Sequence, residues 1–226
     1  MPPDLELTDI ARMVLKKALE RSDQVEVYGE RGDVLSIAVE REEIKKVKHV
    51  RSTGIGVRVA LSKKLGFSYT TALEKANLEE CVEHAIKQAR VSEQDPDFFG
   101  FPPLPARSYT KPVQTVDKRI VDLRSEDAVD YCREMLTAVT DYETSAVCEP
   151  TEGSFAAAHD EACIVNSEGI EMSDTGTYVS AGIMVVARDG EETSGYEGTI
   201  SRQLHDMDFG WIGREAVKMA VDSLGG

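Results

Sequence analysis

The chain has 226 residues, of which 41% are hydrophobic and 30% are charged, and its formal net charge is -15. A chain of this length and composition can bury one large core or two small ones. The acidic balance repels nucleic-acid phosphates and anionic membranes, so small molecules, peptides and other proteins are the favoured partners.

The N-terminal segment and the cysteines bear on the cellular compartment. Residues 1–10 contain neither a basic stretch nor an apolar run, which predicts no signal peptide. No apolar segment approaches the roughly 20 residues of a membrane helix. Cys81, Cys132, Cys148 and Cys163 lack the spacing of a metal site. We therefore expect a soluble, cytoplasmic protein with reduced thiols and no membrane association.

The first half of the chain reads as a helix, a set of strands and a second helix. Thr8 is positioned to cap a helix that runs to about Arg21. Residues 24–70 alternate between apolar and polar side chains, and they predict four or five short strands in hairpins. Asn77 and Glu80 form a capping box for a helix that runs to about Arg90.

A proline-rich stretch separates the two halves. Residues 91–115 hold five of the eight prolines of the chain. Because proline lacks a backbone donor and fixes φ, neither a helix nor a central strand is expected here. We predict a linker, although its segment FFGFPPLP is apolar enough to lie against a surface.

The second half repeats the order of the first. Ser125 is positioned to cap a helix, and residues 154–166 and 177–199 are strand-like. Asp208 is positioned to cap a last helix, which runs from about Phe209 and ends before Gly225-Gly226.

The two halves can be aligned with each other. TGIGVRVALSKKLGFSY overlies VSAGIMVVARDGEETSGY, which pairs Gly56 with Gly182 and, after one insertion, Tyr69 with Tyr196. EHAIKQA likewise overlies REAVKMA. The alignment predicts an internal duplication, and shared hairpin patterning without common origin is the alternative.

The predicted fold class is α+β, with two helix–antiparallel hairpins–helix units joined by the Pro-rich linker. Helices cover one face of the sheet in each unit. The predicted boundaries are 1–92 for the first unit, 93–116 for the linker and 117–226 for the second unit.

The glycines of STGIGVRVALSKKLGFSYT raise the possibility of a phosphate-binding loop. Such a loop requires Gly-Lys-Ser/Thr or a helix directly after the glycines. Gly54 and Gly56 are instead followed by residues 57–61, which alternate with a period of two. The pattern predicts a strand that contains a close-packed glycine.

A basic run could bind nucleic acid. It is interleaved with apolar residues, as expected for a solvated strand face, and the acidic chain disfavours a nucleic-acid partner. The run consists of Arg41, Lys45, Lys46, Lys48, His49 and Arg51.

The histidines do not form a metal-binding pattern. None of His49, His84, His159 and His205 begins a His-Glu-x-x-His sequence. The two acidic-flanked histidines, in 159–161 and 205–208, are predicted at turns or strand ends. Residues 208–210 read Asp-Phe-Gly, but the other kinase motifs are missing. We predict no catalytic, cofactor-binding or metal-binding residue in this chain.

The order of several short motifs resembles that of the TldD/PmbA family, once called modulators of DNA gyrase. The matching elements are Gly54-Ile-Gly56-Val57-Arg58-Val59, Gly66-Phe67, Asn166-Ser167-x-Gly169, Asp189-Gly190 and Gly195-Tyr196. The resemblance runs from about Val25 to Leu224. Family members are about twice as long, so the family's C-terminal domain is expected to be absent from this chain.

The resemblance implies one of two branches. TldD-like members resemble metallopeptidases and carry a His-Glu-x-x-x-His helix in their C-terminal half, whereas PmbA-like members, also called TldE, lack it and pair with TldD. The linker EQDPDFFGFPPLP and the last helix IGREAVKMAVDSLG resemble the PmbA branch. The expected function is therefore a non-catalytic region of a TldD–PmbA peptidase system, which scaffolds the complex and admits unfolded peptide.

The resemblance also sets the expected partners and two alternatives. A TldD-like protein is the expected heterodimer partner, or else the chain forms a homodimer; zinc is expected only in that partner or in a TldD-like C-terminal half. The first alternative is the N-terminal region of a catalytic TldD-like zinc metallopeptidase. The second is a gyrase-binding or nucleic-acid-binding module that acts through the basic run.

Overall fold

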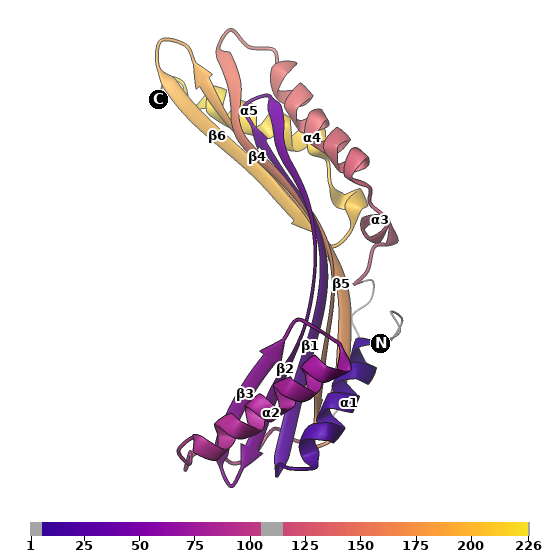
Figure 1. Ribbon diagram of the computed structural model, residues 1–226. Helices are drawn as coiled ribbons and strands as arrows, with labels where there is room; N and C mark the ends of the chain where they lie inside the picture. Colours follow the sequence, from indigo (N-terminus) through magenta and orange to yellow (C-terminus); the bar gives the residue numbers. More distant parts are fainter. Residues whose placement is uncertain (1–5, 105–114, 226) are drawn as a thin grey trace. The chain divides into compact units, whose positions relative to one another are not determined.

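The computed structural model describes residues 6–104 and 115–225 (Figure 1). Helices and strands follow one another as the α+β prediction requires, and that fold class is confirmed. In chain order the elements are α1 (Leu7–Leu19), β1 (Gln24–Glu40), β2 (Glu43–Leu61), β3 (Lys64–Thr70), α2 (Lys75–Val91), α3 (Lys118–Val121), α4 (Ser125–Thr140), β4 (Val147–Asn166), β5 (Glu171–Arg188), β6 (Glu192–Ser201), the 3-10 helix η1 (Leu204–Asp206) and α5 (Phe209–Asp222).

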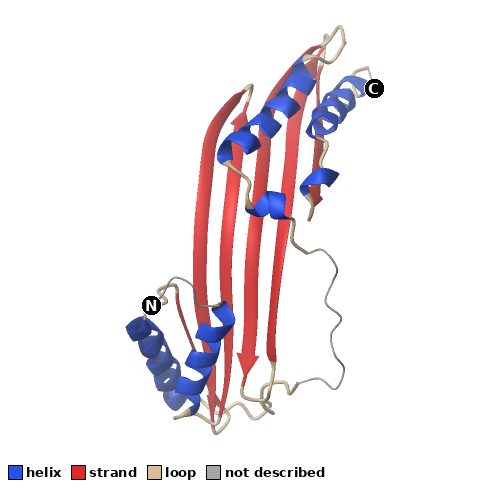
Figure 2. Cartoon of the chain, turned by 90° about the vertical axis from the view of Figure 1, so that its right-hand side faces the viewer, coloured by secondary structure: helices blue, strands red, loops and turns tan. Residues whose placement is uncertain are grey.

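The strands form one six-stranded sheet in the order β3-β2-β1-β4-β5-β6 (Figure 2). The expectation of a separate sheet in each half was therefore wrong. So was the expectation of four or five short strands in residues 24–70, which form three strands, two of them 17 and 19 residues long. The chain instead reverses direction at positions that the sequence marks only weakly as turns. These are Arg41, with φ of 56°, and Ser62–Lys63, with φ of 49° and 65°.

The helix starts differ from three of the predicted caps. Thr8 and Ser125 lie inside their helices, and neither α1 nor α4 has a side-chain cap. The capping box at Asn77 does not form, because α2 begins two residues earlier, at Lys75. The cap predicted for the last helix is confirmed: Asp208 Oδ1 accepts a hydrogen bond from the Trp211 amide at 2.7 Å.

The packing divides the chain into two compact units. Unit 1 comprises the described residues within Met1–Gly32, Arg51–Pro112 and Asp160–Thr175, and unit 2 those within Asp33–Val50, Val113–His159 and Gly176–Gly226. These units interleave along the sequence because the four long strands each contribute to both. The predicted division differs, because it assigns one continuous segment to each unit, with boundaries at 92 and 116.

The predicted linker lies partly outside the described residues, which omit 105–114. Its residues 93–104 belong to unit 1 and contact the rest of that unit. Phe101 is buried, and its amide donates to Gln24 Oε1 at 3.1 Å. Its ring packs edge-on against Phe98 at a centroid distance of 5.4 Å.

Each unit has its own apolar core beneath two helices. In unit 1, the predicted stripe of α2 is buried throughout: Leu78, Cys81, Val82, Ala85, Ile86 and Ala89. It packs with α1 and with strand residues that include Val25, Val27, Ile55, Val57, Val59 and Cys163. In unit 2, α4 and α5 cover strand residues that include Leu35, Ile37, Phe155, Val179, Ile183 and Val185.

Equivalent glycines bring the last helix of each unit onto its edge strand, β3 or β6. A Cβ added at Gly66 would lie 2.0 Å from the Ala85 carbonyl oxygen of α2, and one at Gly195 would lie 2.3 Å from the Ala216 carbonyl oxygen of α5. Only glycine permits so close an approach of a strand to a helix backbone. The contacts match the alignment of EHAIKQA with REAVKMA.

The hairpin registers correct one detail of that alignment. Val59 pairs with Gly66, and Val185 pairs with Gly195. With these pairs superposed, Phe67 rather than Tyr69 occupies the position of Tyr196. The ring of Phe67 accordingly packs on Gly56, as Tyr196 packs on Gly182. The internal duplication itself stays a prediction, now with matching contacts in both units.

Candidate functional site

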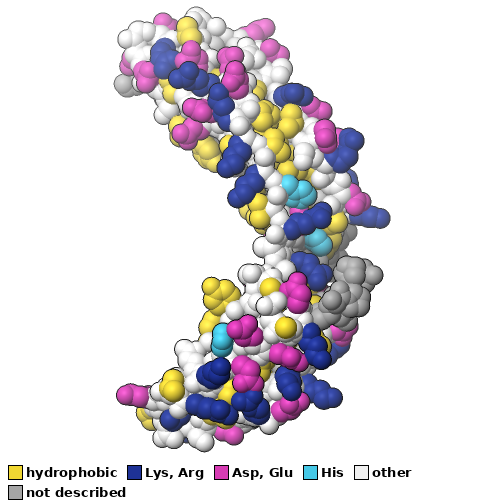
Figure 3. Space-filling model, viewed as in Figure 1, with side chains coloured by type: hydrophobic (Ala, Val, Ile, Leu, Met, Phe, Trp, Pro, Cys, Tyr) yellow, Lys and Arg dark blue, Asp and Glu magenta, His cyan; other side chains and the backbone are white. Residues whose placement is uncertain are grey.

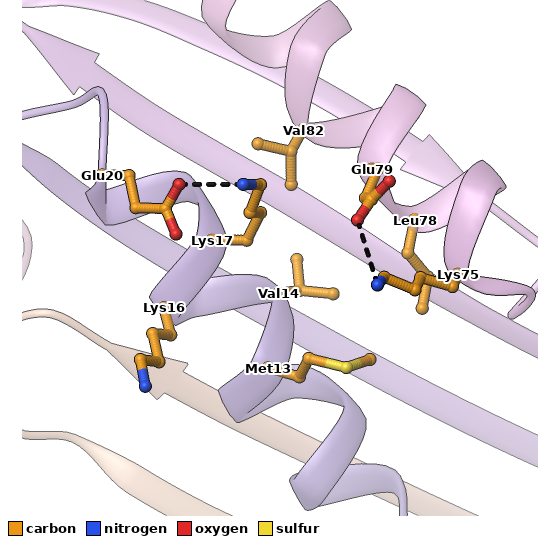
Figure 4. A pocket seen from close by; sticks show the side chains of 9 residues that line it. All are labelled: Met13, Val14, Lys16, Lys17, Glu20, Lys75, Leu78, Glu79 and Val82. Atoms are coloured by element: carbon orange, nitrogen blue, oxygen red, sulfur yellow. Dashed lines mark hydrogen bonds and ion pairs between the residues drawn. The ribbon is translucent and has the colours of Figure 1, made fainter. Parts of the chain in front are cut away.

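A groove between α1 and α2 is an apolar surface feature of unit 1 (Figure 4). Its volume is about 310 Å³, at the lower end of the range for ligand-sized pockets. Side chains of both helices line it: Met13, Val14, Lys16, Lys17 and Glu20 from α1, and Lys75, Leu78, Glu79 and Val82 from α2.

The floor of the groove is apolar and its rim is charged. Val14, Leu78 and Val82 are buried, whereas Met13 is 41% exposed and reaches the opening. On the rim, Lys17 Nζ bonds Glu20 Oε2 at 2.8 Å. The side-chain hydrogen bond between these two raises the pKa of Lys17 and lowers that of Glu20. The groove can therefore receive an apolar group that carries charge at its edges.

The helix pair of unit 2 has a close backbone contact. A Cβ added at Gly213 of α5 would lie 2.3 Å from the Met135 carbonyl oxygen of α4 and 3.0 Å from the Ala138 side chain. The two helix backbones therefore touch there. A neighbouring hollow between α4 and α5 has a volume of about 620 Å³ and is lined by residues that include Glu134, Ala138, Asp141 and Arg214.

The edge strand β6 of unit 2 is a second candidate. Tyr196 and Ile200 are 58% and 71% exposed. The Gly198 amide donates to the side chain of its neighbour, Glu197 Oε1, at 2.8 Å. Because that amide does not point into the β5–β6 ladder, alternation places the backbone groups of Tyr196 and Ile200 on the outer side of β6 as well. An edge strand of this kind is a template for a further strand.

The other edge strand, β3, is partly covered. The Phe67 amide donates to Gln88 Oε1 of α2 at 2.8 Å, and Lys64 forms an isolated antiparallel bridge with Gln94. These contacts occupy positions that an added strand would need. Of the two edges, β6 is therefore the better strand acceptor.

The predicted strand reading of STGIGVRVALSKKLGFSYT is confirmed. Gly54 and Gly56 lie within β2, and β2 pairs with β3 in an antiparallel hairpin. Ile55, Val57 and Val59 point into the core of unit 1. No helix follows the glycines, so the geometry of a phosphate-binding loop does not arise here.

The basic run begins in the turn between β1 and β2 and continues along β2, and its side chains are exposed. Carboxylates accompany it: Lys45 Nζ bonds Glu43 Oε2 at 2.7 Å, and His49 pairs with Asp33. On the face shown in Figure 3, basic and acidic side chains lie next to one another. The run thus follows the mixed surface expected of a solvated strand.

The acidic-flanked histidines occupy two different environments. His159–Glu161 lies within β4, so its predicted position at a turn or strand end was wrong. His205 lies in η1, where its Nδ1 is 2.9 Å from Arg119 Nη2. Within residues 6–104 and 115–225 no group of three or more His, Cys, Asp or Glu side chains is arranged to hold a metal ion. The prediction that this chain has no site residues is not tested by that finding.

A polar network around Asp117 escaped the sequence analysis. Asp117 is buried and accepts hydrogen bonds from the Leu204 amide at 2.8 Å and the Arg119 amide at 2.9 Å, and it is paired with the Arg119 guanidinium. Burial acts to raise the pKa of Asp117, but the bonds from Arg119 and Leu204 outweigh it and lower the pKa to about 2. The Asp117 amide in turn donates to Thr177 Oγ1 at 2.8 Å. The network fastens the start of α3 to β5 and η1.

The cysteines are free thiols. Cys81, Cys132 and Cys163 are buried, and burial raises the pKa of Cys132 to about 12. A thiol with so high a pKa stays protonated and is a poor nucleophile. In the part of the chain that the structure covers, no helix has the length and apolarity needed to cross a membrane.

Comparison with known proteins defines the class of protein. Residues 25–89 match the model of the PmbA/TldA metallopeptidase domain 1, and residues 118–224 match that of the PmbA/TldA metallopeptidase central domain. Two successive domains of one kind of multidomain protein are thus present in order. The chain belongs to the PmbA/TldD family, as its motifs indicated. Among curated proteins, no sequence matches it.

Solved structures share the fold at low sequence identity. TldE from Thermococcus kodakarensis superposes with a TM-score of 0.82 at 19% identity, over 94% of this chain and 47% of that one. A candidate modulator of a DNA gyrase from Thermotoga maritima gives 0.84 at 18%, over 98% and 49%. One from Bacteroides thetaiotaomicron gives 0.83 at 17%, over 96% and 50%. The chain spans about half the length of the solved structures that it matches.

Proposed function

We propose that this chain is the N-terminal region of a PmbA/TldE-like component of a TldD–PmbA metallopeptidase system. In this proposal the region scaffolds the complex and admits peptide, and hydrolysis takes place in a TldD-like partner that holds the zinc. The system is cytoplasmic. The observation that carries the proposal is the ordered match of both domains, over residues 25–89 and 118–224, with a motif set that favours the PmbA branch.

The outer edge of β6 supports the role in peptide admission. An unfolded peptide is extended, and its backbone can pair with the outward groups of Tyr196 and Ile200 by strand addition. The exposed side chains of these two residues would flank the added strand. The opposite edge, at β3, is less accessible because Gln88 and Gln94 already bond to it.

The test is association with a TldD-like protein. The tagged chain, and any longer product of its gene, is co-expressed with a TldD-like protein from the same genome, and both are purified through the tag. We expect a stable complex that cleaves unstructured peptide, whereas neither component alone does so at a comparable rate. Failure to co-purify in both orientations of the tag would refute the proposal.

The gene sequence separates this proposal from its nearest alternative. A His-Glu-x-x-x-His helix encoded downstream of Gly226 would make the protein a TldD-like peptidase instead. Within the complex, Ile200→Pro tests the role of β6, because proline removes an outward N–H without breaking the ladder to β5. We expect it to weaken peptide cleavage while leaving the complex intact.

A further inference from the structure

The helix pair of unit 1 leaves an apolar groove open between α1 and α2. In unit 2, Gly213 lets α5 touch the backbone of α4 near Met135. In unit 1, Met13 and Leu78 line a groove of about 310 Å³ between α1 and α2. Unit 2 also has a hollow between α4 and α5, but no lysine in the described part of the chain lines it, whereas three lysines line the groove of unit 1.

The opening of the groove is suited to an apolar side chain from outside. Met13 is 41% exposed and stands beside the buried Val14 and Val82. Methionine is flexible and polarisable, and it repacks readily around different apolar partners. One exposed methionine is ordinary on a surface, but here it borders an apolar hollow between two helices.

The rim of the groove has more positive than negative side chains, which favours a negatively charged partner. Three lysines, Lys16, Lys17 and Lys75, stand against two glutamates, Glu20 and Glu79, in a chain whose net charge is -15. No carboxylate among the described residues lies within ion-pair distance of Lys16, and the Lys75–Glu79 pair is long, at 3.8 Å. Exposed pairs of this kind contribute little, so the lysines can turn to an incoming carboxylate.

We propose that this groove is the docking site of an acidic amphipathic helix of a partner protein. The helix would insert one or two aliphatic side chains between Met13 and Leu78 and set carboxylates beside Lys16 and Lys75. A linear groove between two helices complements apolar side chains spaced about one helical turn apart. The inference is independent of the proposed function, since it concerns a surface of unit 1, whereas the β6 edge belongs to unit 2.

A designed helical peptide tests the proposal on the intact chain. The probe carries leucines at i, i+3, i+4 and i+7 with glutamates on both sides, and a matched probe carries lysines in place of the glutamates. By fluorescence anisotropy we expect saturable binding of the acidic probe and at least about tenfold weaker binding of the basic one, a difference of about 1.4 kcal/mol. Rising salt should weaken the acidic complex.

Four variants decide where the probe binds. Met13→Glu should weaken the acidic probe by at least about tenfold. Met219→Glu is the matched control, because Met219 of α5 is similarly exposed, at 43%, and it should change nothing. Lys16→Glu combined with Lys75→Glu should reverse the preference between the probes. Thermal melts establish that each variant is folded, and Met13→Ser, which adds no charge, should give a smaller loss.

Three results would overturn the proposal. The first is equal affinity for both probes or no saturable binding of either. The second is binding that survives Met13→Glu. The third is a dimer of the chain that light scattering detects and that Met13→Glu dissolves, since the groove would then be occupied by a second copy.

Discussion

The two units use one arrangement of helices and strands but close their helix layers differently. In unit 2, Gly213 brings α5 into backbone contact with α4, and the aromatic rings of Tyr131 and Phe209 stack across them at 4.5 Å. In unit 1, Met13 and Leu78 hold a groove between α1 and α2. What the units share is the contact of the last helix with the edge strand, through Gly66 and Gly195. The helix–strand contact is common to both units, whereas the helix–helix contact differs and in unit 1 leaves a groove at the surface.

The largest expected effect tests the shared contact. Gly66→Ala and Gly195→Ala each push a Cβ to within 2.0 and 2.3 Å of a helix carbonyl oxygen, which cannot move without shifting the helix. We expect each change to lower the free energy of unfolding by about 3 kcal/mol, at the upper end for overpacking. Urea unfolding followed by circular dichroism measures both.

Gly54→Ala is the control for this pair. Its Cβ would lie 3.6 Å from the Thr70 carbonyl oxygen, an ordinary contact, so we expect a change within about 0.5 kcal/mol. If Gly66→Ala were tolerated while Gly195→Ala was not, the two contacts would not be equivalent. The predicted duplication would then lose its main structural support.

A smaller effect tests the difference between the units. Gly213→Ala places a Cβ 2.3 Å from the Met135 carbonyl oxygen, and relief requires α4 and α5 to separate. We expect a loss of about 2 kcal/mol, because two helices can move apart more easily than a helix can leave its sheet. Hydrogen exchange should increase in α4 and α5 but not in α1 and α2. An equal increase in all four helices would show that the two helix layers do not respond separately.

The sequence predicted local features better than long-range ones. Helical periodicity identified the buried stripe of α2, and Asp208 was recognised as a cap because its carboxylate bonds an amide three residues away. Thr8 and Ser125 also fit the cap pattern, but α1 begins one residue before Thr8 and α4 begins at Ser125 itself. Cap residues in a sequence mark a helix start only to within a turn.

Sheet organisation and the sites depended on contacts that are distant in sequence. Gly32-Asp33 resembles a turn, yet both residues extend within β1 because the strand is paired there on both sides. The Asp117 network joins Asp117 to Thr177 and Leu204, which lie 60 and 87 positions further along the chain, so no local sequence pattern predicts it. The groove of unit 1 likewise requires α1 and α2 to be neighbours. In hindsight, the one available signal was Met13 on the edge of the α1 stripe.

The smallest expected effect separates the units by their response to acid. The pKa of Asp117 is lowered to about 2, so its ionised form stabilises the folded state above the unfolded pKa of 3.8, and this contribution is lost as the pH falls through about 2. Asp117→Asn should therefore lower the free energy of unfolding by about 1.5 kcal/mol near pH 6, where the charged hydrogen bonds are lost, and by nearly nothing near pH 2.

Asp127→Asn serves as the control, because Asp127 pairs with Arg124 on the surface of the same unit and should matter little at either pH. Amide exchange at Arg119 and Leu204, the two backbone donors to Asp117, should rise in the Asp117→Asn protein, while α1 and α2 keep their protection. A pH-independent cost of Asp117→Asn would mean that the side chain acts through its shape and not its charge, and acid would then give no way to distinguish the two units.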